Sequence, residues 1–259
     1  MYRVLLLWCL CTAAWAQDSL QVGWASWHPF SFRDEQQQLQ GLDIDLLQAI
    51  FSRAGFSASY SEMPWARVLR ELEFGTIQLT MSANQTAERE RYARFSLPYR
   101  NEETVLLVRR QDRARWQGIT QLSDLLPRQD FTIGMMRDFD YGTDFRTFMQ
   151  SPQMQDRLLA RLLARLRMEP LLKLLLAGRI QGVVIDPMGL QEISLAGIPL
   201  DDLLPLLNIQ RTPVHLMLSR RTTTPAQLQR LDEAIQALLA SPEYTQILAR
   251  YRYQLPPIR

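Results

Sequence analysis

The chain has 259 residues, and its 29 basic and 27 acidic side chains give a formal net charge of +2 at neutral pH. This near balance excludes the basic surface of a nucleic-acid-binding protein and a polybasic membrane-binding patch. The length suits one large domain or two smaller ones.

The first sixteen residues are predicted to be a cleavable export signal. Residues 1–3 form a short basic start, residues 4–14 an apolar stretch too short to span a bilayer, and residues 14–16 a small-x-small cleavage site. The mature chain is therefore expected to begin near Gln17 and to be periplasmic. Both cysteines of the chain lie within the signal, so no disulfide or cysteine metal site is expected in the mature protein.

From residue 20 to residue 81 the chain alternates predicted strands with predicted helices. The strands are Leu20–Trp24, Phe56–Tyr60 and Ile77–Met81, and apolar stripes of helical period lie between them. Asp43 is placed to cap the first helix, and Pro64 to start the second. This order predicts an α/β fold with a mostly parallel sheet and helices on its faces.

Further strands and helices are predicted after residue 99, so the chain is expected to form two α/β units. The strands are expected at 104–108, 131–136, 180–185 and 214–218, and the helices at 122–126, from about 143, at 170–177, 225–239 and 242–251. Residues 155–167 repeat Leu-Leu-Ala-Arg and fit either a helix or a short strand.

The loop from Ser82 to Arg89 is the strongest candidate binding site. It leads into a helix that begins at Thr86 and carries Arg89 in its first turn. A helix N-terminus carries partial positive charge, so an arginine there is slightly unfavourable unless an anion lies nearby. The loop is therefore predicted to bind a small carboxylate, and the alternative is a surface ion pair of Arg89 with Glu88 or Glu90.

Three predicted strands end in polar loops: residues 82–84, residues 138–142, and Asp186. Ligands of open α/β sheets bind beyond the carboxyl ends of the strands. If the two units face each other, these loops converge on one cleft.

Six segments, in this order and spacing, carry a resemblance to a known family: Pro29-Phe30-Ser31-Phe32, residues 41–46 (GLDIDL), Gly75-Thr76-Ile77, Thr86-Ala87-Glu88-Arg89, residues 95–99 (FSLPY) and Gly178-Arg179-Ile180. Together they resemble the family 3 bacterial extracellular solute-binding proteins, the polar amino-acid-binding group of the periplasmic Venus-flytrap proteins. The resemblance covers about residues 20–251. It implies a two-lobed periplasmic-binding-protein-like (type II) fold with two strand crossovers, lobe 1 at 17–101 plus 214–259 and lobe 2 at 102–213.

The resemblance also implies roles for polar residues. Arg89 would hold the ligand carboxylate, which a planar guanidinium can bind bidentately. Asp186 would hold the ligand ammonium, and its alternative role is to cap the loop before Pro187. Ser82 and Asn84 would offer hydroxyl, amide or backbone groups. Tyr141 and Gly142 belong to a loop whose backbone N–H groups would complete carboxylate binding.

Aromatic residues would form the walls of the cleft. Trp27 and Trp65 match two rings that enclose the ligand side chain, and ordinary core packing is their alternative role. Trp24 lies where relatives that bind basic amino acids often carry an acid. An aromatic pocket without that acid favours a neutral, apolar or aromatic side chain, with a cation stacked on the rings as the alternative.

The predicted function is capture of an amino acid or similar small zwitterion for an ABC-type importer. The protein is expected to act as a monomer, without cofactor, metal, catalytic residue, nucleic acid or membrane insertion. One alternative is a sensor that passes its closed form to a receptor or kinase. Another is an exported cyclohexadienyl dehydratase, but Gly189 stands where those enzymes carry a catalytic glutamate, and Glu192 lies further along the chain.

Overall fold

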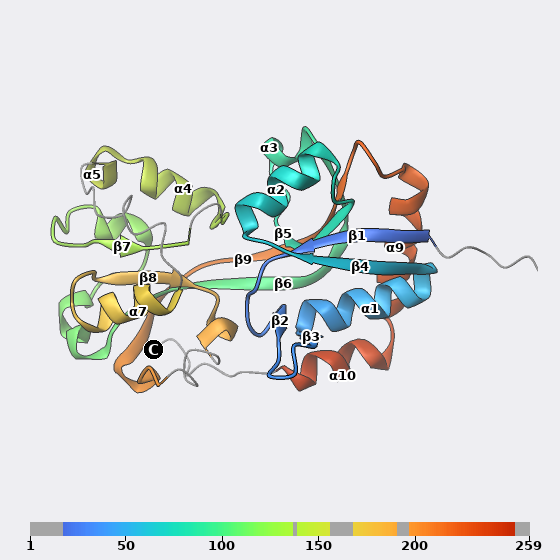
Figure 1. The fold of residues 1–259 in the computed structure, drawn as a ribbon. Helices are drawn as coiled ribbons and strands as arrows, with labels where there is room; N and C mark the ends of the chain where they lie inside the picture. The colour runs from blue at the N-terminus through green and yellow to red at the C-terminus, as the bar shows by residue number, and fades with distance from the viewer. Residues whose placement is uncertain (1–17, 137–138, 156–167, 191–196, 252–259) are drawn as a thin grey trace, which may run out of the picture.

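The computed structural model describes residues 18–136, 139–155, 168–190 and 197–251 (Figure 1). Several features considered above lie outside the described residues: the signal at 1–16, nearly all of the ambiguous run at 155–167, Asp138 and Glu192.

A seven-stranded sheet runs through the molecule in the order β4-β1-β5-β9-β6-β8-β7. β1 pairs in parallel with β4 and β5, and β7 pairs in parallel with β8, whereas β6 and β9 run antiparallel to their neighbours. The sheet is therefore mixed. Its strands are β1 (Asp18–Trp24), β4 (Phe56–Glu62), β5 (Leu79–Ala83), β6 (Ala93–Arg109), β7 (Ile133–Gly134), β8 (Gly182–Ile185) and β9 (Leu203–Ser219), and β2 (Phe32–Arg33) pairs separately with β3 (Leu39–Gln40).

Two long strands connect the two halves of the molecule. β6 and β9 each have 17 residues and pair along almost their whole length. In Figure 1 they cross from the half that holds β1, β4 and β5 to the half that holds β7 and β8. The two-lobed fold class predicted from the sequence is confirmed, whereas the exact lobe boundaries at 101/102 and 213/214 stay a prediction.

Helices cover both halves of the sheet. The α-helices are α1 (Leu42–Ala54), α2 (Trp65–Phe74), α3 (Ala87–Glu90), α4 (Gly142–Gln150), α5 (Pro152–Gln155), α7 (Met168–Leu176), α9 (Pro225–Leu239) and α10 (Pro242–Arg250), and the 3-10 segments are η1 (Arg110–Trp116), η2 (Leu122–Leu125), η3 (Pro187–Gly189) and η4 (Leu200–Asp202). Within the described ranges, none of the helices has the length and apolar character that crossing a membrane requires.

Each half has hydrophobic clusters of its own. In the first half, Ile44, Leu47 and Ile50 of α1 are fully buried against β1 and α9. In the second half, Leu106 and Val184 belong to other clusters, packed around β6 and β8. The groups that lie between the halves are thus positioned by two separately packed cores.

The start of α1 differs from the prediction that Asp43 caps it. The N-cap residue is Gly41, whose φ of +131° brings its backbone against residue 30: a Cβ there would lie 2.3 Å from the Phe30 carbonyl oxygen. Asp43 lies one residue inside the helix, fully buried, and it forms an ion pair with Arg100. The capping prediction was wrong because the long-range arginine takes the carboxylate.

Candidate functional site

Arg89 lies in a single helical turn and is buried. Its backbone N–H donates to the hydroxyl of the N-cap residue Thr86 at 3.3 Å. The residue is only 8% exposed, and its side-chain Nη1 donates to the Asn84 carbonyl oxygen at 2.9 Å. Burial lowers the pKa of Arg89. This position contradicts the alternative of a surface ion pair with Glu88 or Glu90.

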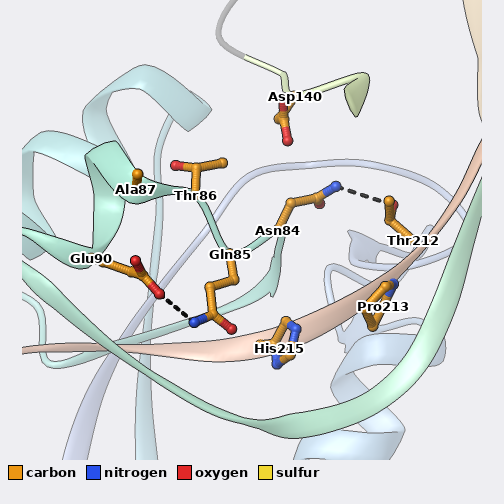
Figure 2. Close-up of a pocket in the computed structure, with 9 residues that line it drawn as sticks. All are labelled: Asn84, Gln85, Thr86, Ala87, Glu90, Asp140, Thr212, Pro213 and His215. Carbon is orange, nitrogen blue, oxygen red and sulfur yellow. Dashed lines mark hydrogen bonds between the residues drawn. The ribbon is translucent and has the colours of Figure 1, made fainter. Parts of the chain in front are cut away.

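A pocket with a volume of about 330 Å³ lies beside this turn (Figure 2). The Asn84 amide donates to the Thr212 hydroxyl at 3.2 Å on one side of it. Asp140 comes from a separate segment, just before α4, and faces Asn84 across the pocket in Figure 2. Neither Arg89 nor Asp186 is among the described residues that line the pocket. The pocket therefore lies beside the predicted charged site and does not enclose it. The remaining lining residues are Gln85, Thr86, Ala87, Glu90, Pro213 and His215.

The Ser82 side chain belongs to a buried ionic network. Its hydroxyl hydrogen-bonds to the Asp43 carboxylate, and its backbone N–H donates to the Tyr99 hydroxyl at 2.9 Å. Asp43 also accepts two hydrogen bonds from Arg100, at 2.6 Å and 2.7 Å. Burial alone lowers the pKa of Arg100, but the Asp43 carboxylate more than reverses this, so Arg100 stays charged. The network, rather than a ligand, satisfies the Ser82 hydroxyl.

Asp186 follows β8 and is almost fully buried, at 5% exposed. Its carboxylate accepts a hydrogen bond from the Met188 N–H at 2.8 Å, so it does cap the turn that begins at Pro187. Burial raises the pKa of Asp186 to about 7. The cap and a ligand contact are compatible, because a carboxylate has about four acceptor positions.

Glu102 is a second buried acid near this site, and the sequence reasoning did not single it out. It lies on β6, is 9% exposed, and burial raises its pKa to about 8. Arg100, Asp186 and Arg89 all contribute to its electrostatic environment. No sequence pattern marks it, because residues 100–104 are all polar; the alternation appears only in the structure, where residues 100, 102 and 104 are buried and residues 101 and 103 are exposed.

Trp27 and Trp65 contact the same ring, Phe139 of the second half. The Trp27 and Phe139 ring centroids are 5.2 Å apart and edge-on, and those of Trp65 and Phe139 are 6.3 Å apart. The Arg89 guanidinium lies 5.6 Å from the Trp65 ring centroid. The two tryptophans therefore enclose a side chain of the protein at the place where a ligand side chain was predicted.

Trp24 lies in the core of the first half. It is 1% exposed and clusters with Phe30 and Leu42, and the Arg33 guanidinium lies 5.5 Å from its ring centroid. This placement favours a core role over the predicted pocket wall.

The loop before α4 supplies its own carboxylate at the predicted anion position. Asp140 accepts a hydrogen bond from the Gly142 N–H at 3.4 Å and pairs with Arg146 at 2.7 Å. Tyr141 is largely buried, and its hydroxyl accepts a hydrogen bond from the Met136 N–H at 2.9 Å. A ligand carboxylate at Gly142 would have to displace Asp140.

Two further residues bear on chemistry. His215 Nδ1 lies 2.7 Å from the Ser96 carbonyl oxygen, and the ring also borders the pocket. Gly189 lies against Trp27, since a Cβ built on it would be 3.6 Å from Trp27 Nε1. No cluster of three or more His, Cys, Asp or Glu suited to a metal ion is found among the described residues.

Two halves joined by two long strands, with buried charges between them, define the class of two-lobed solute-binding proteins. The chain belongs to the bacterial extracellular solute-binding proteins, family 3, whose family model matches residues 20–254.

Its sequence similarity to individual curated proteins extends over only part of each chain. A putative ABC transporter arginine-binding protein of Escherichia coli is 29% identical over 99 residues, which are 38% of this chain and 40% of the relative. A cyclohexadienyl dehydratase of Pseudomonas aeruginosa is 27% identical over 95 residues, 36% of this chain and 35% of the enzyme. The chain thus matches less than half of the length of these curated relatives.

The fold matches solved structures over nearly the whole chain. An ABC uptake transporter substrate-binding protein from Streptococcus pneumoniae, solved with bound histidine, gives a TM-score of 0.70 at 23% identity. The match covers 90% of this chain and 92% of that one, and at this identity it establishes the fold alone.

Proposed function

We propose that the protein binds an amino acid between its two halves and delivers it, as an exported periplasmic monomer, to an ABC-type importer. Arg89 holds the ligand carboxylate, Asp186 holds its ammonium group, and Asn84 contributes its amide or backbone. Opposite charges from the two halves let one zwitterion bridge them and stabilise the closed arrangement.

The observation that carries this proposal is the burial of both charged groups. Arg89 is 8% exposed in one half and Asp186 is 5% exposed in the other. Taking a charge out of water is costly, and a cation and an acid held buried in opposite halves are suited to the two ends of one zwitterion. Membership of a family of solute-binding proteins supports the same reading.

Replacing Arg89 by alanine is expected to abolish amino-acid binding while the fold remains intact. A charged hydrogen bond contributes about 1.5–3 kcal/mol, and two lost from one carboxylate reduce affinity by about 100-fold or more. Isothermal titration with the amino acid that most raises the melting temperature of the wild type measures this loss.

The neighbouring Arg91 provides the matched control, because its side chain is 75% exposed and lies 4.0 Å from Glu88. Arg91→Ala should bind as the wild type does. Equal affinities of the Arg89→Ala and wild-type proteins, with both folded by circular dichroism, would rule out this carboxylate site.

Phe139→Ala is expected to shift the preference toward ligands with larger side chains. The ring lies within contact distance of Trp27 and Trp65, so its removal opens the space between them. Affinity for phenylalanine or tryptophan relative to alanine should rise about tenfold. Phe148→Ala, a change of the same type in the second-half core, is the control that should leave the ratio unchanged.

A dehydratase activity is the second candidate, favoured by the similarity to the Pseudomonas aeruginosa enzyme. Glu102 and Asp186 are buried acids with raised pKa, as a general acid requires. Gly189 supplies no carboxylate at the position expected for that enzyme. Prephenate turnover, followed by its aromatic product, tests this directly, and no turnover is expected.

A further inference from the structure

Ser82 has a backbone conformation that residues other than glycine rarely adopt. Its φ is +56°, in the left-handed region, and it lies near the end of β5. Residues 80–83 of β5 face only three residues of β9, 215–217, so β5 carries one extra residue here, as in a β-bulge. A strained residue of this kind persists only where the surrounding structure holds it, and such residues often lie at functional sites.

A buried network holds Ser82 from two sides. Its backbone N–H donates to the Tyr99 hydroxyl at 2.9 Å, and its own hydroxyl donates to the Asp43 carboxylate. The Tyr99 hydroxyl in turn donates to Asp43 at 2.8 Å. Burial and the charge of Asp43 raise the pKa of Tyr99, so this hydroxyl stays protonated. Because Tyr99 is 1% exposed and Asp43 is 0% exposed, water does not compete for these bonds.

Asn84 connects the conformation of Ser82 to the candidate site. Two residues after Ser82, the Asn84 carbonyl oxygen accepts a hydrogen bond from Arg89 Nη1 at 2.9 Å. The Asn84 amide also donates to the Thr212 hydroxyl at 3.2 Å. A rotation about φ of Ser82 would turn the peptide units that follow and move this carbonyl oxygen away from Arg89. The backbone of Ser82 therefore bears on where the guanidinium lies.

We propose that Tyr99 and Asp43 are positioning residues for ligand binding, because they hold Ser82 in its left-handed conformation. This conformation sets Asn84 and Arg89 in place before the ligand arrives, so the inference rests on the proposed function of the site. Ser82 then acts through its backbone. The resemblance implied a different role for it, in which its hydroxyl or backbone groups contact the ligand.

Two double variants test the role of the backbone: Tyr99→Phe with Ser82→Ala, and Tyr99→Phe with Ser82→Gly. Both lack the same two hydroxyl groups, but glycine adopts a positive φ at no steric cost and alanine does not. Isothermal titration uses whichever of the twenty standard L-amino acids most raises the melting temperature of the wild type. The variant with alanine should bind it about tenfold more weakly than the variant with glycine.

Tyr244→Phe is the matched control for the loss of a tyrosine hydroxyl. The Tyr244 hydroxyl donates to the backbone carbonyl oxygen of Tyr99 at 3.0 Å and makes no contact with Ser82. This variant should bind the same amino acid as tightly as the wild type does. Any general effect of removing a hydroxyl beside Tyr99 would appear here as well.

The single variants Ser82→Ala and Ser82→Gly separate positioning from direct contact. With Tyr99 in place, the bond to the backbone N–H of residue 82 remains, so both should bind within a few-fold of the wild type. If the Ser82 hydroxyl contacted the ligand, both single variants would lose affinity strongly and to the same extent. This comparison decides the question even if a double variant folds poorly.

Urea unfolding without any ligand gives a second readout. While Tyr99 holds residue 82 at positive φ, Ser82→Ala should be less stable than Ser82→Gly. Tyr99→Phe lets the alanine relax, so the difference in the free energy of unfolding between alanine and glycine should fall by at least half in the double variants. A merely structural loss of the Tyr99 hydroxyl would leave this difference unchanged.

The outcomes separate this inference from the proposed function. Equal affinities of the two double variants, with both folded by circular dichroism, would overturn the positioning role while leaving amino-acid binding intact. If no amino acid binds the wild type, the proposed function itself fails. The urea comparison then still tests the network, because an unchanged difference between alanine and glycine would show that Tyr99 does not hold the backbone of Ser82.

Discussion

Replacing Arg100 by methionine is expected to lower the free energy of unfolding by about 3–5 kcal/mol, because it leaves the Asp43 carboxylate buried and unpaired. The two side chains are 3% and 0% exposed and share two hydrogen bonds. For a chain of this size the loss corresponds to a fall in melting temperature of about 10 °C. Urea unfolding and calorimetry measure both quantities.

The control is Arg67→Met. Arg67 pairs with Glu71 one helical turn away, but its side chain is 60% exposed, so the loss should stay below about 1 kcal/mol. The double variant Asp43→Asn with Arg100→Met removes both charges and should recover part of the loss. If Arg100→Met unfolds at the same urea concentration as Arg67→Met, the buried Arg100–Asp43 pair does not stabilise the fold by several kcal/mol.

The sequence was informative about the fold wherever apolar periodicity was uninterrupted. The helix predicted at 225–239 coincides with α9, and the strand at Leu20–Trp24 lies within β1. The two longest strands were each recognised only over a short apolar part. Residues 93–103 of β6 carry a proline and several charged side chains, and residues 203–213 of β9 are broken by two prolines. Their strand conformation depends on pairing with each other, which no local pattern records.

The same distinction between local and tertiary information applies to the residues of the candidate site. Arg89 and Asp186 could be found because each sits in a local motif: a capped helical turn and a strand end followed by proline. Phe139 and Glu102 could not, because what matters about them is tertiary. Phe139 is defined by two tryptophans distant in sequence, and Glu102 by a strand pairing across 110 positions.

A long-range ion pair also explains why the prediction that Asp43 caps α1 failed. The Asp43 carboxylate could cap α1 in an isolated segment, but Arg100 offers it two charged hydrogen bonds. An aspartate cap is also charge-assisted, but the guanidinium binds both oxygens of Asp43 at once, which adds a second bond and a fixed geometry. The same arginine lowers the cost of ionising Glu102 and Asp186, so the structural ion pair and the proposed ligand site are electrostatically linked.

The free energy of unfolding of the unliganded protein is expected to fall as pH rises from about 5 to 8. Burial raises the pKa of Glu102 from 4.5 to about 8 and that of Asp186 from 3.8 to about 7. Between the ordinary and the raised values the folded state binds more protons than the unfolded chain, so stability decreases with pH and levels off above pH 8. One pKa unit corresponds to about 1.4 kcal/mol, which makes the combined change several kcal/mol.

Urea unfolding at pH 5, 6, 7, 8 and 9 measures this profile, and the double variant Glu102→Gln with Asp186→Asn is the control. The variant should give a flatter curve, because neither amide titrates. Glu71 and Asp124 have lowered pKa values and therefore titrate below this window. A wild-type profile as flat as that of the double variant would mean that neither acid is held protonated by burial.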